Sequence, residues 1–336
     1  MGDRARNVGR IQHGSQKGSK LKGRPTPTGF QRTLANIGYI TGSNLIGRVL
    51  NLVLHAVLAR LFGPPGLGGY ATAVAVAAYF VFLVDFGLSP RIAREGAVSP
   101  DKLAEEYASA LGLKLLTGCM SLIALAGICV VLPYEDWVRD LCFLLGCSAI
   151  IRSFSYLNES VCRASERLDL EGAASLLGTS AFTGLALVFL ALDYPIHTVG
   201  YASIVGNCAQ LLLSTIFARR LIPLRFGLPP DWKTARAALP YATTSFSMLA
   251  FAQIDVLMVS LIESTEFVGR YVPASRLLMV VGTIGGLAAS AVLPTASRVY
   301  ANSSAQEIRA LINESVRGIL LLGGFAALGT VIVARP

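Results

Sequence analysis

Four polar side chains interrupt the first apolar run of the chain, which covers residues 36–59. In chain order they are Asn44, Arg48, Asn51 and His55. Their spacings of four, three and four residues place them on one face of a helix. An arginine at the centre of a bilayer costs at least ~2.5 kcal/mol, so such residues usually face a water-filled cavity or a partner. This polar stripe therefore marks a candidate binding surface.

The composition defines the environment in which the polar stripe lies. Hydrophobic residues make up 53% of the 336 residues and charged residues only 15%, whereas a soluble domain carries about 25% charged residues. Apolar runs of membrane-spanning length recur along the chain, and they are continuous, unlike the alternating pattern of a transmembrane barrel. The sequence therefore predicts an all-α polytopic membrane protein.

The apolar runs predict nine membrane-spanning helices, because each run is long enough to cross a bilayer at ~1.5 Å per residue. A cluster rich in Gly and Pro at residues 63–69 should end the first helix and turn the chain back. The predicted spans cover residues 36–59, 70–89, 109–132, 138–160, 171–192, 196–218, 239–262, 271–296 and 315–334.

The positions of the charges predict an orientation. A basic tail at residues 1–33 contains few apolar residues and should be disordered and cytoplasmic. Most cations outside the spans fall in this tail and in alternate loops, and those in the opposite loops are only Arg60, Arg139 and Arg270. The net charge of +9 therefore follows from membrane topology and does not indicate a nucleic-acid partner.

The spans are predicted to form two lobes. The first lobe covers 34–218 with six spans, a Pro-containing cytoplasmic linker covers 219–238, and a partial second lobe with about three spans covers 239–336. An internal repeat supports this division, because Gly68-Gly69-Tyr70 and Gly269-Arg270-Tyr271 each open a span directly after a turn. The equal orientation of the two copies predicts parallel repeats related by an axis along the membrane normal.

Acidic and titratable residues in the spans are candidates for coupling or gating. Asp255 and His55 suit such a role, although an interhelical hydrogen bond explains either residue as simply. Asp85 lies near the end of the second span and is expected to pair with Arg91 or Arg94. That pair would form an inner gate or a solvated helix end.

Two further arginines lie within predicted spans. Arg152 shares one helix face with Tyr156 and Glu159, so these three residues should form a local network. Arg276 lies near the outer end of the eighth span, where its long stem can reach the interface, and it is also a candidate for substrate binding. The six cysteines lie within or beside apolar runs without C-x-x-C spacing, so we expect neither a metal site nor a disulfide.

Short motifs in both halves of the chain point to one family. In the first half they are Ala59-Arg60-Leu61-Phe62-Gly63-Pro64, Gly68-Gly69-Tyr70, Asp85-Phe86-Gly87-Leu88 and the segment 91–95. In the second half they are Asp255, Val268-Gly269-Arg270-Tyr271, Ala274, Arg276 and Leu277. The chain thereby resembles the bacterial polysaccharide-biosynthesis and lipid-linked oligosaccharide flippases. These belong to the multidrug/oligosaccharidyl-lipid/polysaccharide exporter superfamily.

The resemblance implies two six-helix lobes arranged as a V, with a central cavity and transport by alternating access. The implied cargo is a polyprenyl-diphosphate-linked oligosaccharide, moved to the outer leaflet of the bacterial inner membrane for surface polysaccharide assembly. Membrane lipids and polysaccharide-assembly proteins are the implied partners, and neither a cofactor nor a catalytic site is implied. A proton or sodium ion is the candidate coupling ion for residues such as Asp255. Because family members have twelve to fourteen helices, we expect this chain to be C-terminally truncated or to need a second copy.

Arg48 is the expected contact for the diphosphate, since a guanidinium pairs bidentately with phosphate oxygens and stays charged at any depth. Asn44 and Asn51 would then hydrogen-bond the headgroup. Alternatively, Arg48 pairs with Asp255 and locks two helices. A drug or metabolite antiporter of the same superfamily would favour carboxylates in its cavity. A membrane glycosyltransferase or polymerase would need acidic catalytic residues in a sizeable loop, and no loop here is long enough.

Overall fold

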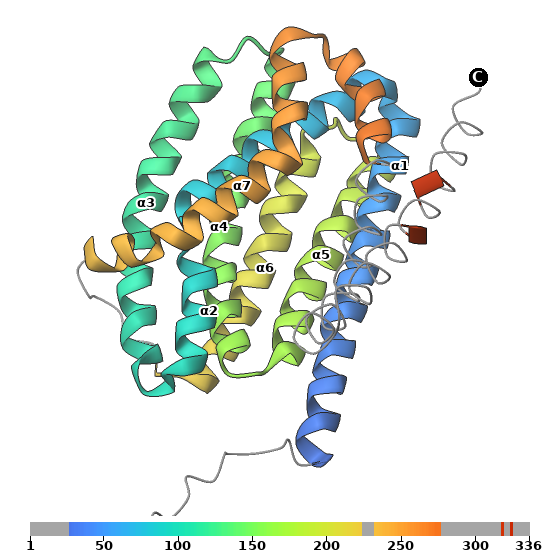
Figure 1. The fold of residues 1–336 in the computed structure, drawn as a ribbon. Coiled ribbons are helices and arrows are strands. Elements are labelled where there is room, and N and C mark those ends of the chain that lie inside the picture. Colours follow the sequence, from blue (N-terminus) through green and yellow to red (C-terminus); the bar gives the residue numbers. More distant parts are fainter. Residues whose placement is uncertain (1–26, 224–231, 277–316, 319–322, 325–336) are drawn as a thin grey trace, which may run out of the picture.

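The computed structural model describes residues 27–223, 232–276, 317–318 and 323–324, and the regular elements of these ranges are all helices (Figure 1). A short helix at 265–276 follows the last labelled element. The labelled elements are α1 (Pro27–Asp85), α2 (Leu88–Val98), the 3-10 helix η1 (Pro100–Lys102), α3 (Leu103–Val131), α4 (Asp136–Ala164), α5 (Leu168–Ala191), α6 (Thr198–Leu221) and α7 (Trp232–Ile262).

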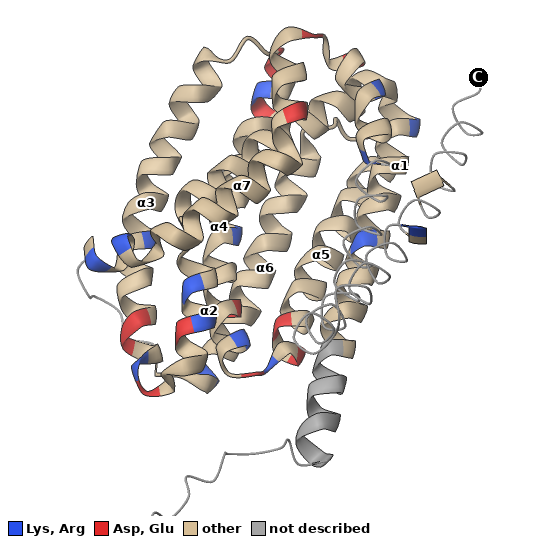
Figure 2. Cartoon of the chain, viewed as in Figure 1, with Lys and Arg blue, Asp and Glu red and all other residues tan. Residues whose placement is uncertain are grey.

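Six of the described helices are long and apolar enough to cross a membrane, by length and composition. Because α1 contains two predicted spans, the first seven predicted spans all coincide with described helices. The predicted spans at 271–296 and 315–334 lie almost entirely outside the described residues. Most charged residues lie toward the two ends of the helices, and few lie in the stretches between them (Figure 2). The chain is thus a multi-pass helical membrane protein.

The chain reverses inside α1 at a single residue. Gly63 adopts φ 65° and ψ −166°, a conformation that residues with a side chain rarely reach. The two arms of α1, 27–62 and 64–85, fold back on each other, so that the rings of His55 and Tyr70 lie 5.4 Å apart. The predicted break over 63–69 is therefore too long. Its prolines begin the second arm, where a missing N–H costs little.

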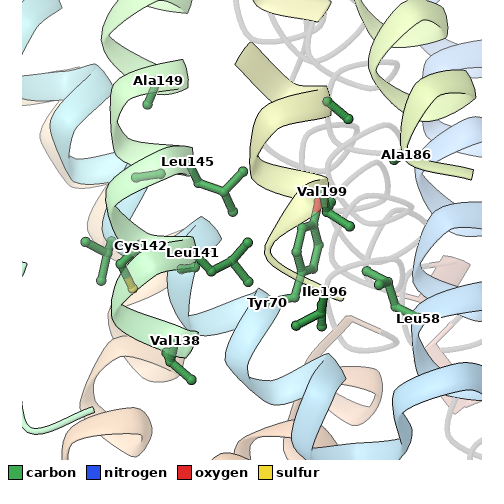
Figure 3. Packing of buried hydrophobic residues seen from close by; sticks show 14 of the residues in the cluster. Leu58, Tyr70, Val138, Leu141, Cys142, Leu145, Ala149, Ala186, Ile196 and Val199 are labelled. Atoms are coloured by element: carbon green, nitrogen blue, oxygen red, sulfur yellow. The ribbon is translucent and has the colours of Figure 1, made fainter. Parts of the chain in front are cut away.

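The largest hydrophobic core lies among both arms of α1, α4, α5 and α6. Figure 3 shows side chains from these helices meeting around Tyr70, which is only 3% exposed. α4 is central to this arrangement, because it packs against α1, α3 and α6. The fully buried residues of this hydrophobic core include Leu58, Val138, Leu141 and Val199.

The second arm of α1 touches the helix at 265–276 through the backbone itself. A Cβ atom added to Gly68 would lie 1.8 Å from the carbonyl oxygen of Thr265, and one added to Gly269 would lie 1.8 Å from that of Pro64. Glycine is therefore needed on both sides of this contact. The two sequence segments that predicted an internal repeat lie against each other at this point.

Candidate functional site

A polar cavity of about 380 Å³ lies among α1, α4, α5 and α6, with one lining residue from α7. Arg152 is the only charged side chain among its described lining residues. Neutral hydrogen-bonding groups provide the rest of the polar lining. The amides are Asn51, Asn207, Gln210 and Gln253, and the hydroxyl groups are Tyr70, Ser148, Tyr156, Thr179 and Ser203.

Arg152 is held by a neighbour on its own helix. Its Nε donates a hydrogen bond to the hydroxyl oxygen of Tyr156 at 2.9 Å, and its guanidinium carbon lies 5.4 Å from the centre of the Tyr156 ring. The predicted contact between these two residues is confirmed. Within the described ranges, no carboxylate lies close enough to Arg152 to form an ion pair. Since a guanidinium does not deprotonate in proteins, the cavity contains a positive charge without an ion-pair partner among the described residues, on which the Glu159 carboxylate acts only from a longer distance.

Glu159 was predicted to join Arg152 and Tyr156, but its hydrogen bond is with Gln210 of α6. It is 3% exposed and accepts a hydrogen bond from Nε2 of Gln210 at 2.6 Å. The predicted network within one helix therefore extends to α6 instead. Further along α4, the Ser148 hydroxyl lies 2.6 Å from that of Ser203 and accepts a hydrogen bond from Asn207 at 2.5 Å. These contacts fix the polar side chains of α4 and α6 that line the cavity.

The structure divides the predicted polar stripe of α1. Asn51 lines the cavity and donates a hydrogen bond to the Gly47 carbonyl oxygen at 2.9 Å. His55 donates through Nδ1 to the Asn51 carbonyl oxygen at 2.7 Å and packs edge-on against Tyr70. Asn44 and Arg48 are exposed and do not line the cavity. The first arm lies at the edge of the described bundle beside α5, so only part of its polar face reaches the interior (Figure 1).

The expected alternative partner of Arg48 is engaged elsewhere. Asp255 accepts a hydrogen bond from the Tyr271 hydroxyl at 3.0 Å and forms no ion pair with Arg48. The hypothesis of an Arg48–Asp255 pair is therefore wrong. Arg276 is exposed, and its charge acts on both His55 and Tyr70. The end of the helix at 265–276 thus lies near the part of α1 that borders the cavity.

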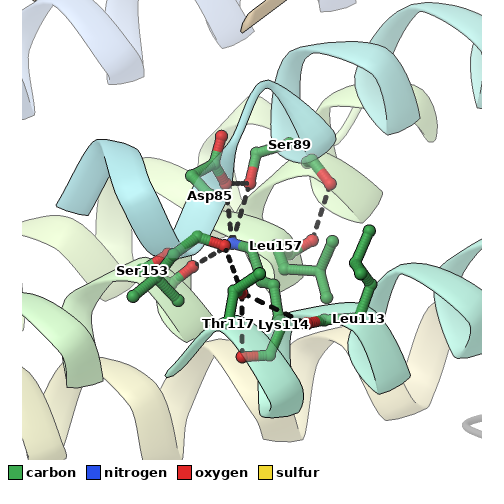
Figure 4. A network of polar contacts seen from close by, with 9 residues as sticks. Asp85, Ser89, Leu113, Lys114, Thr117, Ser153 and Leu157 are labelled. Atoms are coloured by element: carbon green, nitrogen blue, oxygen red, sulfur yellow. Dashed lines mark hydrogen bonds and ion pairs between the residues drawn. The ribbon is translucent and has the colours of Figure 1, made fainter. Parts of the chain in front are cut away.

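A second buried charge cluster joins α1, α2, α3 and α4 (Figure 4). Lys114 is 0% exposed, and its Nζ lies 2.7 Å from Oδ1 of Asp85. The same Nζ donates to the carbonyl oxygen of Ser153 at 2.5 Å and to the hydroxyl of Ser89 at 3.2 Å. Ser89 in turn donates to Asp85. All donors of Lys114 therefore end on protein oxygens.

The predicted partners of Asp85 are wrong. Arg91 instead pairs with Glu95 at 2.8 Å and with Glu106 at 3.1 Å. The cause is the turn between α1 and α2, where Phe86 and Gly87 both have positive φ, so that Arg91 is directed toward α3. Sequence reasoning also missed Lys114, although a single cation inside the apolar run 109–132 was a visible signal.

The family described as polysaccharide biosynthesis protein matches residues 33–300. The chain belongs to this family. The resemblance noted in the sequence is thereby confirmed. Among curated proteins, none matches the chain significantly.

Solved structures similar to this family member are transporters of the MOP superfamily. An inward-facing multidrug resistance MATE family transporter has a TM-score of 0.65 and 17% identity, covering 84% of this chain and 69% of its own. An outward-facing MATE transporter has a TM-score of 0.56 and 16% identity, covering 90% and 72%. A MOP transporter from Pyrococcus furiosus has a TM-score of 0.55 and 17% identity, covering 92% and 75%. These similarities establish the fold.

Proposed function

We propose that this protein exports a polyprenyl-diphosphate-linked oligosaccharide by alternating access, from the inner to the outer leaflet of a bacterial inner membrane. A headgroup rich in phosphate and hydroxyl groups must cross ~30 Å of hydrocarbon, where each unsatisfied polar group costs several kcal/mol. The observation that carries the proposal is the charge of Arg152, which lines the cavity among neutral amides and hydroxyls and forms no ion pair with a described residue. Such a lining suits an anionic, hydroxyl-rich cargo.

A multidrug antiporter is the alternative within the same superfamily. Cationic drugs favour a cavity that offers carboxylates, and no carboxylate is among the described residues of this lining. For the Pyrococcus furiosus transporter, a reversed polarity of the binding pocket suggests a different function. The sign of the cavity charge therefore favours the anionic cargo here. The same absence of lining carboxylates disfavours a membrane glycosyltransferase or polymerase.

The exposed polar residues of α1 keep a role in this proposal. Arg48 is exposed and forms no ion pair with a described residue, so its guanidinium is available for the diphosphate. Asn44 and Arg276 lie on exposed faces and would assist there. Asp255 remains the candidate for coupling to a proton or sodium ion, because its Oδ1 is buried without a hydrogen-bond partner among the described residues.

The other two residues that were candidates for coupling are better explained by structural contacts. His55 is engaged with Asn51 and Tyr70, and Asp85 is engaged with Lys114 inside the same helix bundle. In the proposed orientation the N-terminus is cytoplasmic, and membrane lipids and polysaccharide-assembly proteins are the partners.

Complementation of a flippase-deficient bacterial strain tests this function. We expect Arg152→Ala to abolish complementation and Arg152→Lys to retain part of it, because lysine keeps the charge without the planar fork. Arg48→Ala should also abolish it, and Arg48→Lys should retain part. The control is Arg139→Gln on α4, because Arg139 is partly exposed, pairs with Asp136 and does not line the cavity. Full complementation by Arg152→Ala would contradict the proposal.

A further inference from the structure

We propose that the cavity around Arg152 binds one singly charged anionic group on the saccharide, the carboxylate of an acidic sugar, and does not bind the diphosphate. This assignment rests on the proposed function and specifies which part of the cargo the cavity recognises.

The first argument is the charge of the cavity. Arg152 supplies the only formal charge among the described lining residues, so one carboxylate neutralises it. A diphosphate ester carries a negative charge on each of its two phosphates, which would leave one of them without a cationic partner in the cavity. Charge balance therefore favours a singly charged group beside Arg152.

The second argument is the geometry of the guanidinium. Tyr156 accepts the Nε hydrogen bond, which fixes the plane of the group and leaves the two terminal nitrogens for a ligand. Arg91, by contrast, has a terminal nitrogen buried without a hydrogen-bond partner among the described residues, whereas no nitrogen of Arg152 is sealed in this way. Two parallel N–H groups match the two oxygens of a carboxylate.

The third argument is the neutral lining. Asn207 uses its Nδ2 on Ser148 and Gln210 uses its Nε2 on Glu159, so each amide keeps its carbonyl oxygen for a ligand donor. Asn51 on α1 and Gln253 on α7 add two further amides to the lining. Sugar hydroxyl groups are the ligand groups that donate to several such acceptors at once. A volume of about 380 Å³ is near the lower end of the ~300–1,000 Å³ of small-molecule sites, which suits a sugar unit and not a whole lipid-linked oligosaccharide.

The diphosphate is then expected to bind a different residue, Arg48. Arg48 lies on the exposed part of the first arm of α1, outside the cavity. The two ends of the headgroup would therefore contact different cations. This separation allows the two contacts to be tested independently.

The test measures binding to the purified full chain in nanodiscs. One probe is a trisaccharide with one glucuronate residue, and its matched control is the methyl ester of the same trisaccharide, which has nearly the same shape but no charge. We expect the acid to bind at least roughly tenfold more tightly than the ester. Equal binding of acid and ester to the wild-type protein would overturn the assignment without any variant being needed.

Variants identify the residue responsible. Arg152→Gln should remove the preference for the acid over the ester, Arg152→Lys should retain part of it, and Arg139→Gln should leave it unchanged. Inorganic pyrophosphate is the third probe, and its binding should be lost in Arg48→Ala but retained in Arg152→Gln. Loss of pyrophosphate binding in Arg152→Gln would overturn the assignment, because the cavity would then bind the diphosphate.

Transport assays separate this assignment from the proposed function. Liposomes containing the protein are given lipid-linked oligosaccharides with a neutral or an acidic sugar. Transport of both cargoes without a preference for the acid would overturn the assignment and leave the proposed function intact. Acid-selective binding without transport of either cargo would support the sugar site and overturn the flippase function.

Discussion

Lys114 and Arg152 are two cations that lie in neighbouring apolar helices, yet their nearest polar partners differ. Lys114 on α3 is fully buried, lies 2.7 Å from the carboxylate of Asp85 and donates only to protein oxygens. Arg152 on α4 is half-buried, contacts a neutral phenol and faces a polar cavity. The first charge has an ion-pair partner within the protein, whereas the second has none among the described residues and borders a cavity.

The difference shows how to interpret a charge inside a membrane helix. The presence of a cation in an apolar run marks an energetic cost but does not say how that cost is offset. A carboxylate within ion-pair distance offsets it inside the fold. Where the neighbours are neutral and a cavity adjoins the charge, water or an anionic ligand must provide the compensation. The partner of the cation therefore decides between a structural and a functional role.

The largest effect on stability is expected from removing Lys114, the cation that pairs with Asp85. Lys114→Met leaves Asp85 buried without its cation, so we expect the free energy of unfolding to fall by about 3–5 kcal/mol. Thermal unfolding of the purified protein in detergent measures this loss. The control is Asp169→Ala, because the Asp169–Arg167 pair is partly exposed and such pairs contribute about 0–1 kcal/mol. Adding Asp85→Leu to Lys114→Met should restore most of the stability, and a stable single variant would contradict the comparison.

Replacing Arg152 by methionine should affect transport and not stability. Arg152→Met breaks no ion pair, and the nearby Glu159 keeps its hydrogen bond from Gln210, so we expect the free energy of unfolding to change by less than about 1 kcal/mol. Transport of an acidic lipid-linked oligosaccharide should fall roughly 10–100-fold, because a charge-assisted bidentate contact is lost. A loss of stability as large as that of Lys114→Met would show that Arg152 is also a structural cation.

A third variant would convert one kind of site into the other. Ala149 lies one helical turn before Arg152 and lines the cavity, so Ala149→Asp places a carboxylate beside the guanidinium. We expect acidic cargo to bind roughly tenfold more weakly while the unfolding temperature is maintained. Ala149→Asn is the control of equal size without the charge. Equal weakening by both substitutions would attribute the effect to cavity volume and not to charge.

The smallest effect is expected from the residue that orients Arg152. Tyr156→Phe keeps the ring beside the guanidinium but removes the acceptor of the 2.9 Å hydrogen bond. A lost hydrogen bond of this kind costs about 1 kcal/mol, so the half-saturating concentration of acidic cargo should rise a few-fold at an unchanged maximal rate. The control is Tyr201→Phe, since Tyr201 is exposed on α6. A fall in maximal rate alone would contradict a positioning role.

Much of the fold could be predicted because bilayer thickness sets the length of an apolar helix. The first seven predicted spans coincide with described helices for this reason. The contact between Arg152 and Tyr156 was also predictable, since a spacing of four residues brings side chains together on any helix. The reversal at Gly63 was predicted at the right place but too long, because prolines that break a helix interior are well accommodated in its first turn.

The parts of the site that could not be predicted depend on contacts between distant residues. Asp85 was expected to pair with Arg91 or Arg94. The turn after Asp85, where two residues have positive φ, directs Arg91 toward α3, and Asp85 pairs with Lys114 of α3 instead. Helical periodicity placed Asn44, Arg48, Asn51 and His55 on one face. It contained no information on where neighbouring helices end, so it did not show that only Asn51 lines the cavity.

The one-residue reversal at Gly63 makes the two arms of α1 a hairpin with no loop between them. Within this hairpin the ring of Tyr70 lies 5.4 Å from that of His55. A polar side chain of the first arm is therefore partly covered by a residue of the same hairpin, and this contact needs no residue of a later helix.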